Sequence, residues 1–187
     1  MSTDPYDTRL SIYSTALQPS ALAPNPVDKQ MLSFGFRSWT APFGAWGGAQ
    51  TLAGGTLYVA PCWFEAGLQI SQFFIAVTSD AKNISFARWG VYHIVSKALL
   101  ASSGDLTSIL TGGEGTRVLP LQAPWTAPED RNYLCGLLQV GPAPAKAAGS
   151  LPVAVTTYGA AQQAGLADLP NPIVPASTTV QVNYGAG

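Results

Sequence analysis

The stretch RNYLCGLLQV, residues Arg131–Val140, decides the fold class of this chain. Positions 133, 135 and 137 carry Tyr, Cys and Leu, and positions 134, 136 and 138 carry Leu, Gly and Leu. Successive residues of a strand point to opposite faces, so both faces of this segment would be apolar or small. Such a strand is typical of the middle of a protein, with a layer on each side.

Similar short apolar runs, separated by Gly, Pro, Ser and Asp clusters, indicate an all-β protein. We predict strands over residues 32–39, 56–64, 68–77, 86–94, 97–101, 116–122 and 131–140, a break over 123–130, and short helical turns over 105–110 and 160–166. Two packed antiparallel sheets would bury the aromatic side chains of these runs. The expected core aromatics are Trp63, Phe64, Phe73, Phe74, Phe86, Trp89 and Tyr92. The predicted fold is an antiparallel, jelly-roll-like β-sandwich.

Three regions divide the chain. Residues 1–31 contain four prolines and show neither a helical nor a strand period, so we expect an extended arm that lies on a neighbouring subunit. Residues 32–158 form the expected sandwich domain. Residues 159–187 form a loop-rich C-terminal segment, whose alternating stretch over 178–184 predicts a last strand at the sheet edge of its own domain or of a neighbour.

The charge content argues against several classes of partner. Charged residues make up 10% of the 187 residues, where roughly 25% is usual, and the formal net charge is -1. A surface with so few charges favours self-association. The nine Lys and Arg residues form no cluster, so we expect no nucleic-acid partner. No apolar run approaches the ~20 residues that cross a bilayer, and the acidic start does not resemble a signal peptide, so we expect a soluble, non-exported protein.

The two cysteines, Cys62 and Cys135, both lie in predicted strands. Two cysteines are too few for a disulfide scaffold, and free cysteine packs as a small apolar residue. We interpret both as buried thiols. A disulfide between the two strands remains the alternative.

Residues that could perform catalysis are sparse. His93 is the single histidine and lies in a predicted strand without a nucleophile motif beside it, so we expect a hydrogen-bonded structural role. The predicted turns hold the carboxylates that we expect to be solvated: Glu65, Asp80, Asp105, Glu114, Glu129 and Asp130. The run GGEGTR at 112–117 lacks the Gly-Lys-Ser/Thr ending of a phosphate loop and leads into a strand. We therefore expect no enzymatic activity, metal or cofactor.

Two of the five tryptophans fall in predicted loops. Trp46 lies in AWGG at 45–48, and Trp125 lies in APWT at 123–126. Exposed loop tryptophans can contact another subunit or stack on a sugar. Trp46 and Trp125 are therefore the candidate binding residues, with subunit contact favoured over glycan contact.

Five segments, in order, carry a resemblance to a known family: GTLYV at 55–59, AGLQI at 66–70, WGVY at 89–92, LLASSGD at 99–105 and RNYLCGLL at 131–138. Over residues 54–140 the chain resembles the small β-sandwich domains in virion proteins of tailed phages that infect actinobacteria. In that family a Gly-Leu-Tyr-Asp-like step precedes a Leu-Leu-Ala strand and a later Tyr-Tyr-Leu strand. Val91-Tyr92-His93 stands here where the family has Leu-Tyr-Asp.

Members of that family occur as minor tail proteins, fibre parts and capsid surface proteins. The resemblance therefore implies a non-enzymatic accessory protein of the virion, assembled in the host cytoplasm and attached to the capsid or tail surface through its arm and subunit contacts. The implied partners are major capsid or tail proteins and further copies of this chain, with a homotrimer by analogy. The alternative is a carbohydrate-binding adhesin at the phage tail tip.

Overall fold

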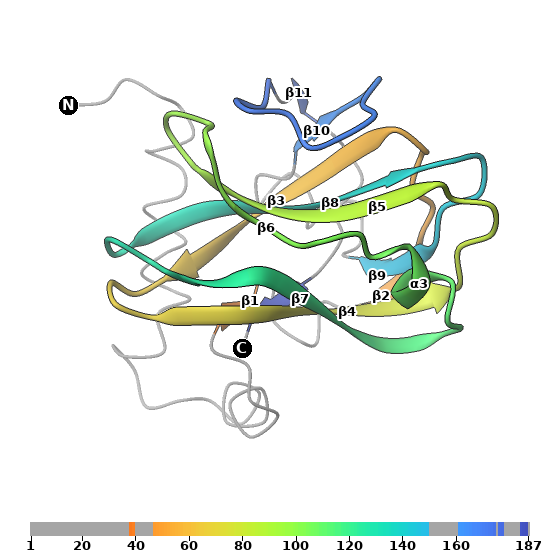
Figure 1. The fold of residues 1–187 in the computed structure, drawn as a ribbon, viewed down its shortest axis with the longest axis horizontal. Coiled ribbons are helices and arrows are strands. Elements are labelled where there is room, and N and C mark those ends of the chain that lie inside the picture. Colours follow the sequence, from red (N-terminus) through yellow and green to blue (C-terminus); the bar gives the residue numbers. More distant parts are fainter. Residues whose placement is uncertain (1–37, 40–46, 150–160, 175, 178–183, 187) are drawn as a thin grey trace.

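A computed structural model describes residues 38–39, 47–149, 161–174, 176–177 and 184–186. Two antiparallel β-sheets lie face to face in this part of the chain, with one short helix beside them (Figure 1). The prediction of an all-β sandwich is confirmed. No helix among the described residues is long and apolar enough to cross a membrane.

The first sheet, sheet B, runs in the order β11-β10-β3-β8-β5-β6. Its strands are β3 (Thr56–Phe64), β5 (Phe86–His93), β6 (Leu99–Ser102), β8 (Arg131–Val140), β10 (Ala161–Gln163) and β11 (Ala176–Ser177). β8 is central, because it pairs with β3 along one edge and with β5 along the other. The segment RNYLCGLLQV is therefore the buried central strand that its sequence predicts.

The second sheet, sheet A, is built around β4 and runs in the order β1-β12-β4-β9-β2, with β7 also paired to β4. Its strands are β1 (Ser38–Trp39), β2 (Gly47–Gln50), β4 (Gln69–Ser79), β7 (Gly115–Thr126), β9 (Lys146–Gly149) and β12 (Tyr184–Ala186). β12 pairs with the middle of β4 and β9 with its end. The first and last described strands of the chain, β1 and β12, pair with each other.

Strand β7 connects the two sheets. Its register with β4 jumps from the pair Gln72 and Pro120 to the pair Ile70 and Trp125, so the intervening residues bulge away from β4. Within this bulge Leu121 forms a backbone bridge with Ser103, just beyond β6 of sheet B. The sandwich is thereby closed along this side.

The main core fills the space between the sheets and follows a period of two along each strand. In β8 it contains Tyr133, Cys135 and Leu137, the odd-numbered set of the sequence pattern. The large side chains at its centre are Phe64, Ile70, Phe73, Ile75, Trp89 and Tyr133, each at most 1% exposed. Burying side chains of this size stabilises the fold by about 1.5–3 kcal/mol each.

A second apolar cluster covers the outer face of sheet B. The even-numbered residues Leu134 and Leu138 of β8 belong to it, together with Tyr92 of β5. Residues 164–174, named the strap, lie over this face and place Leu166, Leu169 and Ile173 against it. β8 therefore lies between two layers, as its doubly apolar pattern predicts, and the outer layer comes from the C-terminal segment.

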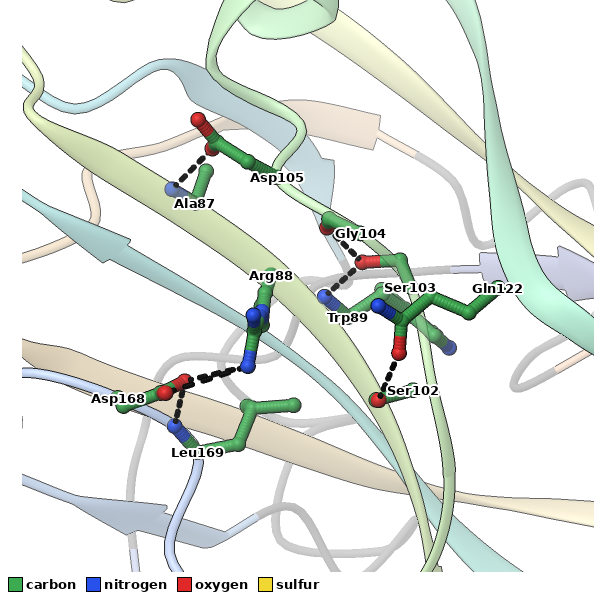
Figure 2. A network of polar contacts seen from close by, with 10 residues as sticks. All are labelled: Ala87, Arg88, Trp89, Ser102, Ser103, Gly104, Asp105, Gln122, Asp168 and Leu169. Carbon is green, nitrogen blue, oxygen red and sulfur yellow. Dashed lines mark hydrogen bonds and ion pairs between the residues drawn. The ribbon is translucent and has the colours of Figure 1, made fainter.

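The strap is also fixed by polar contacts. The Arg88 guanidinium donates to both carboxylate oxygens of Asp168 at 3.2 Å (Figure 2). The backbone amide of Leu99 donates to Asn171 Oδ1 at 2.9 Å, and the amide of Ile173 donates to the Lys97 carbonyl at 3.0 Å. The strap is therefore held to both strands of the β5–β6 hairpin.

Beyond the end of β6, side chains continue the hydrogen bonding of β5. Figure 2 shows Ser103 Oγ accepting from the Trp89 amide at 2.9 Å, and Asp105 Oδ1 accepting from the Ala87 amide at 3.2 Å. Asp105 Oδ1 also accepts from the amide of Thr107, the first residue of helix α3 (Thr107–Leu110). These contacts satisfy an edge that could otherwise pair with another strand. The helical turn predicted over 105–110 is confirmed, two residues shorter at its start.

Several expectations need correction. The helical turn predicted over 160–166 is wrong, because Ala161–Gln163 is strand β10, where pairing with β3 overrides the helix preference of alanine. The break predicted over 123–130 is too long, because β7 continues to Thr126. Trp63 and Phe74 are partly exposed, because their positions in the alternation of β3 and β4 point away from the main core. Phe86 is also partly exposed and packs against the second apolar cluster instead of the main core.

The described parts of the predicted C-terminal segment pack with both sheets. The region 159–187 contributes β10, β11 and the strap to sheet B, and β12 to sheet A, so its described parts are integrated into the sandwich. Residues 1–31, most of the strand predicted over 32–39, and residues 178–183 of the predicted last strand lie outside the described residues.

Candidate functional site at the loop end

Three connections meet at one end of the sandwich, named here the loop end. They are residues 65–68 between β3 and β4, 94–98 between β5 and β6, and 127–130 between β7 and β8. The strand registers bring them together, because Phe64 pairs with Arg131, Gln69 with Thr126, and His93 with Tyr133. This end is on the left in Figure 1.

Aromatic rings close the core at the loop end. Trp125 meets Phe64 and Tyr133 edge to face, with centroid distances of 5.7 and 5.0 Å. The rings of Phe64 and Tyr133 lie 5.8 Å apart. Trp125 lies in β7 and not in the loop predicted for it, and it is partly buried and packs against the main core. It therefore presents only part of its indole to solvent.

Three polar side chains converge beside these rings, and they are named the polar triad. Glu129 Oε1 lies 3.0 Å from Arg131 Nη1 and 3.5 Å from His93 Nε2. Arg131 Nη1 also contacts His93 Nε2. The side chains of Glu129, Arg131 and His93 are 49%, 30% and 22% exposed, so solvent reaches all three groups.

Backbone contacts define the orientation of the His93 ring. Nδ1 accepts from the amides of Val95 and Ser96 at 3.3 and 3.0 Å, so this nitrogen carries no proton. Nε2 faces both the Arg131 guanidinium and the Glu129 carboxylate. The expectation of a hydrogen-bonded strand histidine is confirmed, and His93 is the last residue of β5.

The loop that carries Glu129 is held from two sides. Tyr133 Oη donates to the Glu129 carbonyl at 3.1 Å, and burial raises the pKa of the Tyr133 hydroxyl, which keeps it a donor. Asp130 Oδ1 accepts from the Ala66 amide at 2.6 Å, which links the β7–β8 and β3–β4 connections. The adjacent acids Glu129 and Asp130 thus have different partners and form no carboxylate pair.

The other predicted site residues are placed as follows. Trp46 lies outside the described residues. Asp80 and Asp105 lie near turns as expected but have protein partners: a hydrogen bond from Lys82 lowers the pKa of Asp80, and a hydrogen bond from Thr107 lowers the pKa of Asp105. The run GGEGTR leads into β7 as predicted, and Arg117 folds back onto the carbonyls of Gly112, Gly113 and Glu114.

The two cysteines are free and buried, as their sequence context predicts. Cys135 pairs with Ala60 across the β3–β8 ladder, and Cys62 lies two residues further along β3 on the same face. Burial raises the pKa of the Cys135 thiol, and the hydrogen bond with Cys62 adds to that shift. A buried, protonated thiol is a poor nucleophile.

The sequence pattern predicts a strand at His93 and a turn at Glu129, but it does not predict that the two side chains lie close together. The antiparallel pairing of β5 with β8 creates the polar triad, because it sets the end of β5 beside the start of β8. Among the described residues, no group of three or more His, Cys, Asp or Glu side chains could hold a metal ion.

No protein-family model matches the chain, and no curated protein is significantly similar to it in sequence.

Proposed function

We propose that this chain is a non-enzymatic structural accessory protein of a tailed-phage virion, attached to the capsid or tail surface through its N-terminal arm and subunit contacts. The observation that carries the proposal is the pairing of β1 with β12 and of β12 with β4. The first described residue, Ser38, therefore lies in sheet A, and we propose that the partner bound by the arm lies on this side of the sandwich.

Two further observations support this proposal. Residues 54–140, which carry the resemblance to phage virion proteins, span the chain from β3 to β8 and therefore include the central strands of both sheets. The β4–β7 pair also presents uncharged side chains outward, among them Thr116, Val118, Pro120 and Gln122. A surface without charge does not repel a further copy of itself, which favours a homo-oligomer.

Deletion of residues 1–31 tests the proposal. The truncated protein should retain its β-sheet circular dichroism and cooperative melting, because the described residues of both apolar clusters lie between Leu52 and Ala186. It should fail to join phage particles assembled in its presence, as measured by mass spectrometry of purified virions. A variant with the arm sequence scrambled controls for length and composition. Incorporation of the truncated protein at the wild-type level would contradict the proposal.

A further inference from the structure

We infer that the loop end binds a neutral saccharide, through the polar triad and the exposed part of Trp125. This binding site adds a recognition function to the proposed structural one. The accessory protein would then also bind glycans. The arm and the loop end use different residues, so each function can fail without the other.

The charges of the polar triad select a neutral ligand. Glu129 Oε1 and Arg131 Nη1 lie 3.0 Å apart, so the two charges compensate each other. An anionic ligand near Arg131 would also meet Glu129, and the same end carries Glu65 and Asp130. A cationic ligand would meet Arg131. A neutral ligand avoids both repulsions.

The donors and acceptors of the triad match a pair of sugar hydroxyls. Both described contacts of the Glu129 carboxylate use Oε1, which leaves Oε2 as an acceptor. The described contacts of the Arg131 guanidinium use Nη1, which leaves Nη2 and Nε as donors. A hydroxyl both donates and accepts, so two neighbouring hydroxyls could donate to Glu129 and accept from Arg131.

The aromatic side of the site suits the apolar face of a sugar ring. Trp125 is a partly exposed residue whose ring is fixed by edge-to-face contacts with Phe64 and Tyr133, so it needs no reordering to receive a ligand. The Tyr133 ring also lies 6.5 Å from the ring of His93, which links the aromatic group to the polar triad. Rigid aromatic rings beside a few converging polar groups are the usual composition of a small-molecule site.

The test uses the full-length protein on a printed array of neutral oligosaccharides of glucose, galactose, mannose and N-acetylglucosamine, with sialylated glycans as the acidic set. Saturable binding to at least one neutral glycan is expected, and weaker binding to the sialylated set. The best neutral glycan is then titrated by calorimetry against the wild type, Glu129→Gln and Arg131→Gln. Each substitution should weaken binding on the order of ten-fold or more, because each removes a charged hydrogen-bond partner.

The control variant is Glu114→Gln, which removes a carboxylate at the opposite end of the sandwich, just before β7, and should bind as the wild type does. Thermal melts should show that all three variants are folded. Two results would overturn the inference: no neutral glycan bound at concentrations up to about 10 mM, or equal binding by the wild type and both triad variants. Particle incorporation, measured separately, should be unchanged in Glu129→Gln.

Discussion

Gly90 of β5 and Gly136 of β8 pair directly across the ladder of sheet B, on the face that the strap covers. A Cβ atom on Gly136 would lie 2.5 Å from Val59 Cγ1 and 2.6 Å from the Tyr58 carbonyl. A Cβ atom on Gly90 would lie 2.8 Å from the Tyr92 ring and 3.2 Å from Leu169 Cδ1. The glycine pair therefore provides the space in which the second apolar cluster packs.

Gly136→Ala should lower the free energy of unfolding by about 1–3 kcal/mol, because the new methyl group meets backbone as well as side chain and the sheet cannot move away. Gly90→Ala should cost less, because the atoms it meets belong to side chains. Gly104→Ala is the matched control, since no atom lies within 4 Å of its added Cβ. Urea unfolding measures all three. A Gly136→Ala protein as stable as the wild type would contradict the described packing.

Two neighbouring residues of the strap should differ sharply when truncated. Ile173 is 2% exposed and belongs to the second apolar cluster, whereas Val174 is 74% exposed. Ile173→Ala should cost about 2–4 kcal/mol, and Val174→Ala should stay within about 0.5 kcal/mol. Denaturant unfolding and exchange of the backbone amides of Leu99 and of position 173 report the effect. Equal losses in the two variants would show that the strap does not pack as described.

The ion pair between Arg88 and Asp168 should contribute little by itself. The two side chains are 30% and 56% exposed, so water and salt weaken their attraction. Asp168→Asn should therefore lower stability by at most about 1 kcal/mol, and the loss should shrink further in 1 M NaCl. A loss above about 2 kcal/mol, measured by thermal or urea unfolding, would mean that the pair is a main anchor of the strap.

The Cys135 thiol should make stability depend on pH in the alkaline range. Burial raises the pKa of this thiol in the folded protein, whereas an unfolded chain ionises its thiol near about 8.5. Between these values the folded state holds a proton that the unfolded state has lost, so stability falls as pH rises above about 8.5. The unfolding free energy of Cys135→Ala should fall less steeply between pH 8 and 9.5, by up to about 1.4 kcal/mol per pH unit. Parallel slopes for the two proteins would contradict a buried thiol.

Much of the fold was predictable because β-strands have a simple period. The apolar or small residues at alternating positions of β8 predicted that both faces of this strand are buried. The limits of β3 and β8 also agree with their predicted ranges. The identity of the layer that covers the outer face was not predictable. Residues 160–166 were predicted to form a helical turn, but pairing with β3 and β11 makes Ala161–Gln163 a strand. The polar triad could not be predicted from the sequence either, because His93 and Glu129 lie far apart in the chain and are brought together by strand pairing.

Direct imaging of the phage particle by electron cryomicroscopy, with this chain located in the density, tests the proposed virion role most directly. We expect density for the two-sheet sandwich at repeated positions on the capsid or tail surface, with the paired strands β1 and β12 facing the underlying lattice. Purified, infectious particles that contain no copy of this chain would contradict the proposed virion role.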